Sequence, residues 1–343
     1  MSFITFPIKT CGSLTSDLGG FTVSTTDLSQ RVITDPSMTK HVDFNWKIPP
    51  AKELLDGAVL DRWTEEKDAV DSESDCLFKV DDCGFYIYWK SEGREGDVLD
   101  VSQVNDIRPG EHPKDERLKA SFVRKHGENY LEKAFIICSG LDMVNIRATN
   151  VICKDVSTLN TWKKGLRSLT NNVKMNNICP MIGLQKHHLK ILLSTEVDGK
   201  VGVKTIAKTF ASGRSEKQVY QILADNGLPN GKGDSMEKDK FTFDIFYQIY
   251  DNICIRTDIE DLFKSLTKTD TLAAGKFMEF LNDKQRDSRL NQILYPEYNK
   301  NRVKEIITHF EPNQENVAAE VISKEGVIKY LMSDDNAPVF LDR

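Results

Sequence analysis

The sequence has no long uninterrupted run of apolar residues. The longest candidates are short stretches such as residues 134–138, far below the roughly 20 residues that a membrane-spanning helix requires. The first 20 residues contain neither a basic cluster nor a sustained apolar core, so they are not typical of a secretory signal. These absences favour a cytoplasmic protein that does not span a membrane.

Cysteine is sparse, and its spacing excludes two classes of small domain. The seven cysteines are odd in number, scattered along the chain and free of any CxxC spacing, which argues against a disulfide framework and a zinc finger. The motifs GxxxxGK[ST], GxSxG and HExxH are also missing. Adjacent His187 and His188 point about 100° apart on a helix, so we expect a surface or half-buried pair and no metal site.

Neither sign of charge dominates. The 46 basic and 52 acidic residues give a net charge of −6, which argues against nucleic acid as a partner, because binding to the phosphate backbone needs a basic surface. At 343 residues, with 39% apolar and 29% charged residues, the chain is expected to fold into two or three globular domains.

The N-terminal half is typical of an antiparallel sheet that follows a leader. Residues 1–40 are rich in Ser, Thr, Asp and Gly and show no apolar periodicity, which predicts a poorly ordered leader. A short helical pattern follows Pro49 and Pro50. Strand-like segments then follow one another between polar turns. We predict strands at residues 76–80, 85–90, 97–107, 119–123, 134–138 and 143–151.

The period of the apolar residues changes after Lys154. Val156, Leu159, Trp162 and Leu166 fall on one helical stripe. Strands followed by one amphipathic helix with a central Trp have the order of a pleckstrin-homology domain. The fold class is therefore predicted to be α+β, with a PH-like bent antiparallel β-sheet capped by a C-terminal helix over residues 41–173.

The remaining chain is predicted to be an all-α, EF-hand-like array. Capping boxes at Ser215 and Thr257 begin two of its helices, and further apolar stripes at helical spacing follow. Helices in pairs, separated by loops with a small apolar centre, are typical of EF-hand modules. We predict four such pairs over residues 174–334, with residues 335–343 beginning a linker.

Two loops of this array can be compared with a calcium-binding EF-hand loop, which has a Gly at position 6 and a bidentate Glu at position 12. Residues 194–205 place Gly199 at position 6 but Thr205 at position 12. Residues 265–276 place Lys276 at position 12, where a cation repels the metal. We therefore predict that both loops are structural, with no metal site and no cofactor in this chain.

Three cations of the sheet domain are candidates for contact with an inositol phosphate: Lys79, Lys90 and Arg94. They flank the turns where a PH domain can hold such a headgroup. Four carboxylates interleave with them: Asp81, Asp82, Glu92 and Glu95. Because these carboxylates largely cancel the local positive field, solvated charge is the favoured interpretation of the three cations.

Several long motifs resemble the phosphoinositide-specific phospholipase C family, specifically the photoreceptor-type branch of its beta class. The resemblance covers residues 41–343, and it independently implies a PH domain followed by four EF-hands. The motifs lie at residues 79–110, 203–229, 241–250, 280–298 and 326–343.

The resemblance also implies a function. The full-length relative would hydrolyse phosphatidylinositol 4,5-bisphosphate to diacylglycerol and inositol trisphosphate, using histidines and calcium in a barrel that follows the last motif. We expect that this barrel, and with it every catalytic residue, is absent here. The chain would be regulatory, cytoplasmic and peripheral at the inner face of the plasma membrane. Its expected partners are a Gq-type Gα subunit, the membrane, and Gβγ or a small GTPase through the PH domain.

By motif, the G-protein contact is expected at Arg289, Leu290, Asn291 and Gln292. In the family this asparagine orients the GTP-hydrolysing machinery, and a side-chain amide suits that role because it both donates and accepts hydrogen bonds. Gln292 stands where beta-class relatives usually carry Glu. A simple turn between two helices is the alternative interpretation of this segment. For the whole chain, the alternative is a non-catalytic PH/EF-hand adaptor or natural short form.

Overall fold

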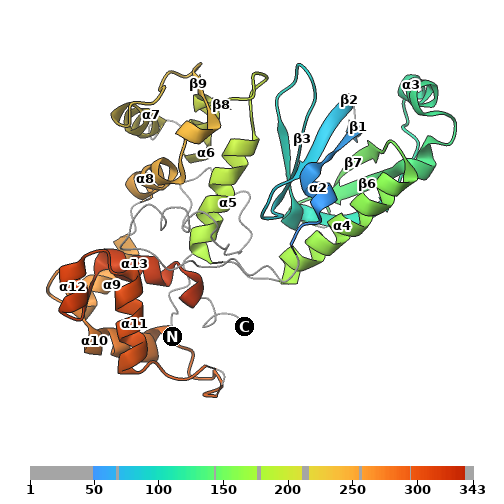
Figure 1. Cartoon of the computed structure of the whole chain (residues 1–343). Coiled ribbons are helices and arrows are strands. Elements are labelled where there is room, and N and C mark those ends of the chain that lie inside the picture. Colours follow the sequence, from blue (N-terminus) through green and yellow to red (C-terminus); the bar gives the residue numbers. More distant parts are fainter. Residues whose placement is uncertain are drawn as a thin grey trace.

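The computed structural model describes residues 49–66, 69–142, 144–175, 179–210, 216–254, 257–293 and 295–336. The predicted leader and most of the predicted linker lie outside these ranges. Figure 1 shows a curved sheet crossed by the long helix α4, a first helical lobe beside the sheet, and a second helical lobe below the first. The predicted α+β fold class is confirmed. No helix in the described part of the chain combines the length and apolar content needed to cross a membrane.

The sheet has seven antiparallel strands in the order β4-β3-β2-β1-β7-β6-β5. The short helix α2 (Lys52–Asp56) precedes it, and the sequence did not predict the first strand that follows. The strands are β1 (Ala58–Glu66), β2 (Ala69–Val80), β3 (Tyr86–Lys90), β4 (Asp97–Asp100), β5 (Val104–Pro109), β6 (Ala134–Ser139) and β7 (Arg147–Ile152).

The strand predicted at residues 97–107 is wrong as a single element. A 3₁₀ turn, Val101–Gln103, divides it into β4 and β5, which lie at opposite ends of the strand order. The Asp100 carboxylate starts this turn by accepting a hydrogen bond from the Ser102 amide at 2.8 Å. A single chain segment therefore forms both edges of the bent sheet.

The strand predicted at residues 119–123 is also wrong, because this segment belongs to helix α3 (Glu116–His126). The Asp115 side chain caps the helix by accepting from the Arg117 amide at 2.8 Å, as N-cap residues do. Helix α3 contacts the sheet through Phe122, which packs against Trp63 with ring centroids 4.8 Å apart. After α3, the 3₁₀ turn Tyr130–Lys133 leads into β6.

Helix α4 (Val156–Met175) closes the sheet as the apolar stripe predicted. Its central Trp162 is 1% exposed and meets the edge of Phe78 at a centroid distance of 6.2 Å. Phe78 in turn stacks on Trp89 at 4.9 Å. This aromatic row fills the space between the sheet and its capping helix.

The helical region forms helix–loop–helix pairs, and two-stranded ribbons join the loops of neighbouring pairs. Strands β8 (Val201–Gly202) and β9 (Ser235–Met236) connect the first two loops, and β10 (Thr271–Ala273) and β11 (Val321–Ser323) connect the last two. The helices are α5 (Pro180–Leu193), α6 (Val203–Phe210), α7 (Glu216–Asp225), α8 (Phe243–Ile253), α9 (Thr257–Leu266), α10 (Ala274–Phe280), α11 (Lys300–Phe310), α12 (Gln314–Ala318) and α13 (Lys324–Leu331).

Capping boxes predicted the start of two of these helices. Helix α9 starts at Thr257. The predicted cap Ser215 lies outside the described residues, immediately before α7.

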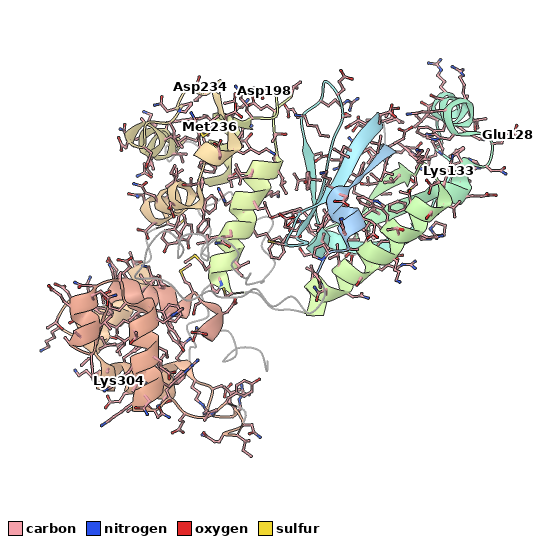
Figure 2. All side chains as sticks on the ribbon, viewed as in Figure 1. Glu128, Lys133, Asp198, Asp234, Met236 and Lys304 are labelled. Atoms are coloured by element: carbon pink, nitrogen blue, oxygen red, sulfur yellow. The ribbon has the colours of Figure 1, made fainter. Side chains whose placement is uncertain are left out.

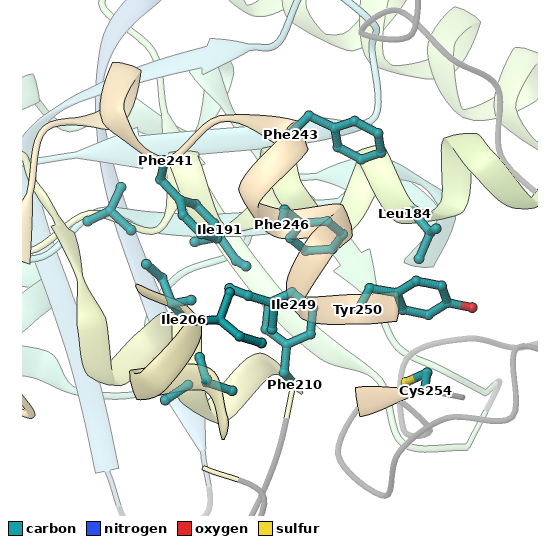
Figure 3. Packing of buried hydrophobic residues seen from close by; sticks show 14 of the residues in the cluster. Leu184, Ile191, Ile206, Phe210, Phe241, Phe243, Phe246, Ile249, Tyr250 and Cys254 are labelled. Atoms are coloured by element: carbon teal, nitrogen blue, oxygen red, sulfur yellow. The ribbon is translucent and has the colours of Figure 1, made fainter. Parts of the chain in front are cut away.

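Several aromatic side chains meet in the core of the first helical lobe (Figure 3). Phe246 lies at its centre, with Phe210 at a centroid distance of 4.7 Å and Phe243 at 5.8 Å. His188 belongs to this core, since it is 4% exposed and its Nε2 lies 2.7 Å from the Phe241 carbonyl oxygen. The expectation of a surface or half-buried histidine pair is therefore wrong, because His187 is also buried, at 8% exposure.

Candidate functional site

The predicted G-protein contact lies in the loop that links α10 to α11. Helix α10 ends in a short π-helical turn, Leu281–Gln285, and the chain then folds around the buried side chain of Arg286. This guanidinium donates hydrogen bonds to the carbonyl oxygens of Asp287, Leu290 and Tyr295 at 2.8–3.3 Å. Because three carbonyls of one loop share a single cation, the base of the loop is fixed.

The structure divides the four predicted contact residues between the inside and the outside of the loop. Leu290 is only 9% exposed, so its side chain helps to hold the loop and presents little surface to a partner. The Arg289 side chain is 79% exposed and pairs with Asp287, with Nη2 2.6 Å from Oδ2. Asn291 and Gln292 are exposed.

The turn at Asn291 directs a further apolar residue outward. The Asn291 Oδ1 accepts a hydrogen bond from the Ile293 amide at 2.8 Å, and the Gln292 amide donates to Glu297 at 3.1 Å. Ile293 is 89% exposed. Ile293 was not among the predicted contact residues, because its aliphatic character alone does not indicate that it is exposed. The exposed surface of the loop thus includes Arg289, Asn291, Gln292 and Ile293.

The three cations predicted to contact an inositol phosphate already have different roles in the structure. The Arg94 guanidinium lies 2.8 Å from Asp71 and 3.3 Å from Glu73. The Lys90 ammonium donates to two backbone carbonyls of the helical region. Lys79 makes no side-chain hydrogen bond or ion pair within the described residues. Because the three cations have different surroundings, their contact with an inositol phosphate stays a prediction.

The carboxylates beside Arg94 are bound from two sides. The buried Arg62 guanidinium also contacts Asp71, at 2.6 Å, and Glu73. Burial alone would raise the pKa of the Asp71 carboxyl. The hydrogen bonds from Arg94 and Arg62 together have a larger opposite effect, so its pKa lies below the usual range. Both carboxylates are charged at neutral pH and neutralise the two guanidinium groups.

The EF-hand-like loops are held together by the protein's own side chains. In the fourth pair, the buried Glu311 carboxylate accepts from the Ser323 amide at 2.6 Å and from the Asn316 amide at 3.0 Å. In the third pair, Thr269 Oγ1 donates to the Thr271 carbonyl oxygen at 2.7 Å. Figure 2 labels Asp198 and Asp234 at the same end of the first lobe. Across the described residues, no group of three or more His, Cys, Asp or Glu side chains is arranged to hold a metal ion.

We expect that calcium does not bind these loops at micromolar concentration. Loop affinity depends on the number of carboxylate ligands and on the clamp at position 12, which is Thr205 in one loop and Lys276 in the other. Calorimetric titration of the chain with calcium should show only the heat of dilution. A one-site isotherm at micromolar calcium would contradict this expectation.

Three family models match consecutive parts of the chain. Residues 50–177 match a PH domain. Residues 184–254 match the phosphoinositide phospholipase C beta1-4-like EF-hand domain. Residues 246–340 match the EF-hand-like domain of phosphoinositide-specific phospholipase C. These ranges coincide with the sheet and the two helical lobes.

Whole-protein comparisons agree with these models. The chain is 48% identical over 314 residues to 1-phosphatidylinositol 4,5-bisphosphate phosphodiesterase of Drosophila melanogaster, covering 89% of this chain and 29% of that protein. It is 45% identical over 311 residues to the human beta-4 enzyme, covering 89% of this chain and 26% of that protein. The crystal structure of S. officinalis PLC21 superposes with a TM-score of 0.69 at 26% identity, covering 86% of this chain and 38% of that one.

The chain thus spans only 26–29% of the length of these two relatives. The matched part carries the same two domain types in the same order as the fold described above. The chain belongs to the phosphoinositide-specific phospholipase C beta family and corresponds to its N-terminal region, a PH domain followed by EF-hand domains.

Proposed function

We propose that this chain is the regulatory part of an enzyme that hydrolyses phosphatidylinositol 4,5-bisphosphate to diacylglycerol and inositol trisphosphate. Relatives that share its sequence over most of its length are named as phosphodiesterases of this lipid. The reacting groups and their calcium ion would belong to the catalytic barrel of the full-length enzyme. The 343-residue chain alone is therefore expected to leave inositol lipids intact.

The regulatory role proposed for the chain is to engage an activated Gq-type Gα subunit. The loop between α10 and α11 supports this role, because its base is buried while Asn291, Gln292 and Ile293 are exposed. Binding costs less conformational entropy when the bound geometry exists beforehand. The carbonyls held by Arg286 provide that preorganisation.

We further propose that the chain works at the inner face of the plasma membrane as a peripheral protein. The β6–β7 turn supports a membrane contact, because Leu141, Val144 and Ile146 are 63%, 87% and 40% exposed. The Asp142 carboxylate stiffens this turn by accepting from the Val144 amide at 2.7 Å. Exposed aliphatic side chains on a rigid turn can enter the lipid interface without a change in backbone conformation. Gβγ or a small GTPase remains a further proposed partner of the PH domain.

Isothermal titration against a Gαq-type subunit tests the proposed partner. The chain should bind the subunit in its GDP–aluminium fluoride state and show at least tenfold weaker binding to the GDP state. Ile293→Ser should weaken binding. Val197→Ser is the control, because Val197 is also exposed but belongs to a different loop. Equal affinity for both nucleotide states would contradict the proposal.

A further inference from the structure

The loop of the first helix pair receives a cation from the sheet domain. The Lys90 side chain, at the end of β3, places Nζ 3.0 Å from the Glu196 carbonyl oxygen and 3.0 Å from the Val197 carbonyl oxygen. These residues stand at positions 3 and 4 of the loop 194–205. More than a hundred residues separate Lys90 from this loop along the chain, so the contact joins two domains.

A neighbouring backbone contact keeps the loop next to the lysine. The Gly96 amide, at the end of the turn after β3, donates to the Thr195 carbonyl oxygen at 2.7 Å. A side chain at position 96 would collide with Thr195, since an added Cβ would lie 2.8 Å from its Oγ1. Figure 1 shows this turn beside the segment that follows α5. The glycine permits the close approach that brings Lys90 to the loop.

The loop geometry suits an ammonium ion. The Glu196 carbonyl oxygen accepts from both Lys90 Nζ and the Gly199 amide, at 3.0 and 2.9 Å. Gly199 has a φ of +83°, a backbone conformation that favours glycine, and its position lies next to Lys90, since an added Cβ would be 3.6 Å from Nζ. An ammonium group has three donors and no acceptor, and backbone carbonyls are suitable partners for it.

Other charges around the loop disfavour a divalent metal at the same place. Burial and, after it, the Lys90 ammonium lower the pKa of Lys238, a second lysine of this lobe. Lys200 lies on the loop itself and pairs with Glu237 at 3.6 Å. The loop carboxylates are Glu196 and Asp198. Calcium would face two lysine ammonium groups there without the carboxylate at position 12.

We propose that the first EF-hand-type loop is a receptor for the ammonium group of Lys90, and that this contact joins the PH sheet to the first helical lobe. The inference is independent of the proposed G-protein contact, because it concerns a different loop and a ligand within the chain.

The proposal predicts that removing the ammonium loosens the loop and that a small amine restores it. In the full chain, Lys90→Ala should raise the hydrogen-exchange rates of the Glu196 and Gly199 amides at least tenfold. Methylammonium at about 100 mM should restore most of the protection, since it can donate hydrogen bonds to the carbonyl oxygens that Lys90 no longer contacts. Sodium chloride at equal ionic strength and calcium at 1 mM should not restore this protection. Lys79→Ala, on the same face of the sheet, is the matched control and should leave exchange unchanged.

Lys90→Met keeps a long apolar side chain but removes the ammonium group, with its charge and its N–H donors, so it should show the same loss even if the alanine variant is partly unfolded. Unchanged exchange in Lys90→Met would overturn the proposal. Failure of methylammonium to protect the alanine variant would also overturn it, and so would restoration by calcium, which would identify a metal site.

Discussion

We expect the chain to accelerate GTP hydrolysis by an activated Gαq-type subunit, and we expect Asn291→Ala to abolish that acceleration. A positioned amide can orient a catalytic glutamine and its water, and removing one such preorganised group costs about 10² in rate or more. Single-turnover measurement of phosphate release, with the chain in excess over the GTP-loaded subunit, provides the readout. The rate with Asn291→Ala should fall to that of the subunit alone.

A second variant separates chemistry from loop structure. The Asn291 Oδ1 holds the turn by accepting from the Ile293 amide, so alanine removes both the turn contact and the amide group. Asn291→Asp keeps an oxygen acceptor for that contact but has no N–H donor. We expect Asn291→Asp to bind the subunit with affinity within threefold of the parent chain and yet fail to accelerate hydrolysis. Full acceleration by either variant would refute the role assigned to this residue.

Asp100→Asn is expected to produce the largest loss of stability at the domain junction, about 3 kcal/mol. Lys186 of α5 places Nζ 2.6 Å from Asp100 Oδ2, with the two side chains only 10% and 12% exposed. The same ammonium lies 5.4 Å from the centroid of the Tyr86 ring. The asparagine keeps the cap on Ser102 but leaves a buried ammonium without its counter-charge. Urea denaturation measured by tryptophan fluorescence and circular dichroism would detect the loss.

The double variant Asp100→Asn/Lys186→Met should recover most of this stability, because a buried pair replaced on both sides leaves no uncompensated charge. Glu325→Gln provides the control, since its pair with Lys329 joins side chains that are 64% and 21% exposed. That change should alter the free energy of unfolding by less than about 0.5 kcal/mol. A loss of similar size in the single and double variants would show that the ion pair is not the cause.

The periodicity of apolar residues predicted the elements whose partners lie nearby in the sequence. An apolar stripe that includes Trp162 and Leu166 predicted helix α4, and a continuous apolar run predicted strand β6. The two errors in the sheet have local causes that apolar periodicity does not reveal. Carboxylates of Asp100 and Asp115 cap helical turns inside segments that alternate like strands.

The candidate sites were predicted less completely than the fold. Leu290 and Ile293 are both aliphatic and both flank Asn291, so the sequence could not show that the first is buried and the second exposed. The difference arises because Arg286 binds the Leu290 carbonyl. Lys90 was a candidate for contact with an inositol phosphate, with solvated charge as the favoured interpretation, whereas its partners in the structure lie more than a hundred residues further along the chain. No local pattern indicates such a contact.

The 3₁₀ turn Val101–Gln103 has a consequence for self-association. The strands that it joins are the two edges of the sheet, β4 and β5, and unpaired edges are templates on which other chains can add strands. Three residues are too few to let the edges separate. We therefore expect a longer connection to let the two edges separate and to favour intermolecular β-pairing.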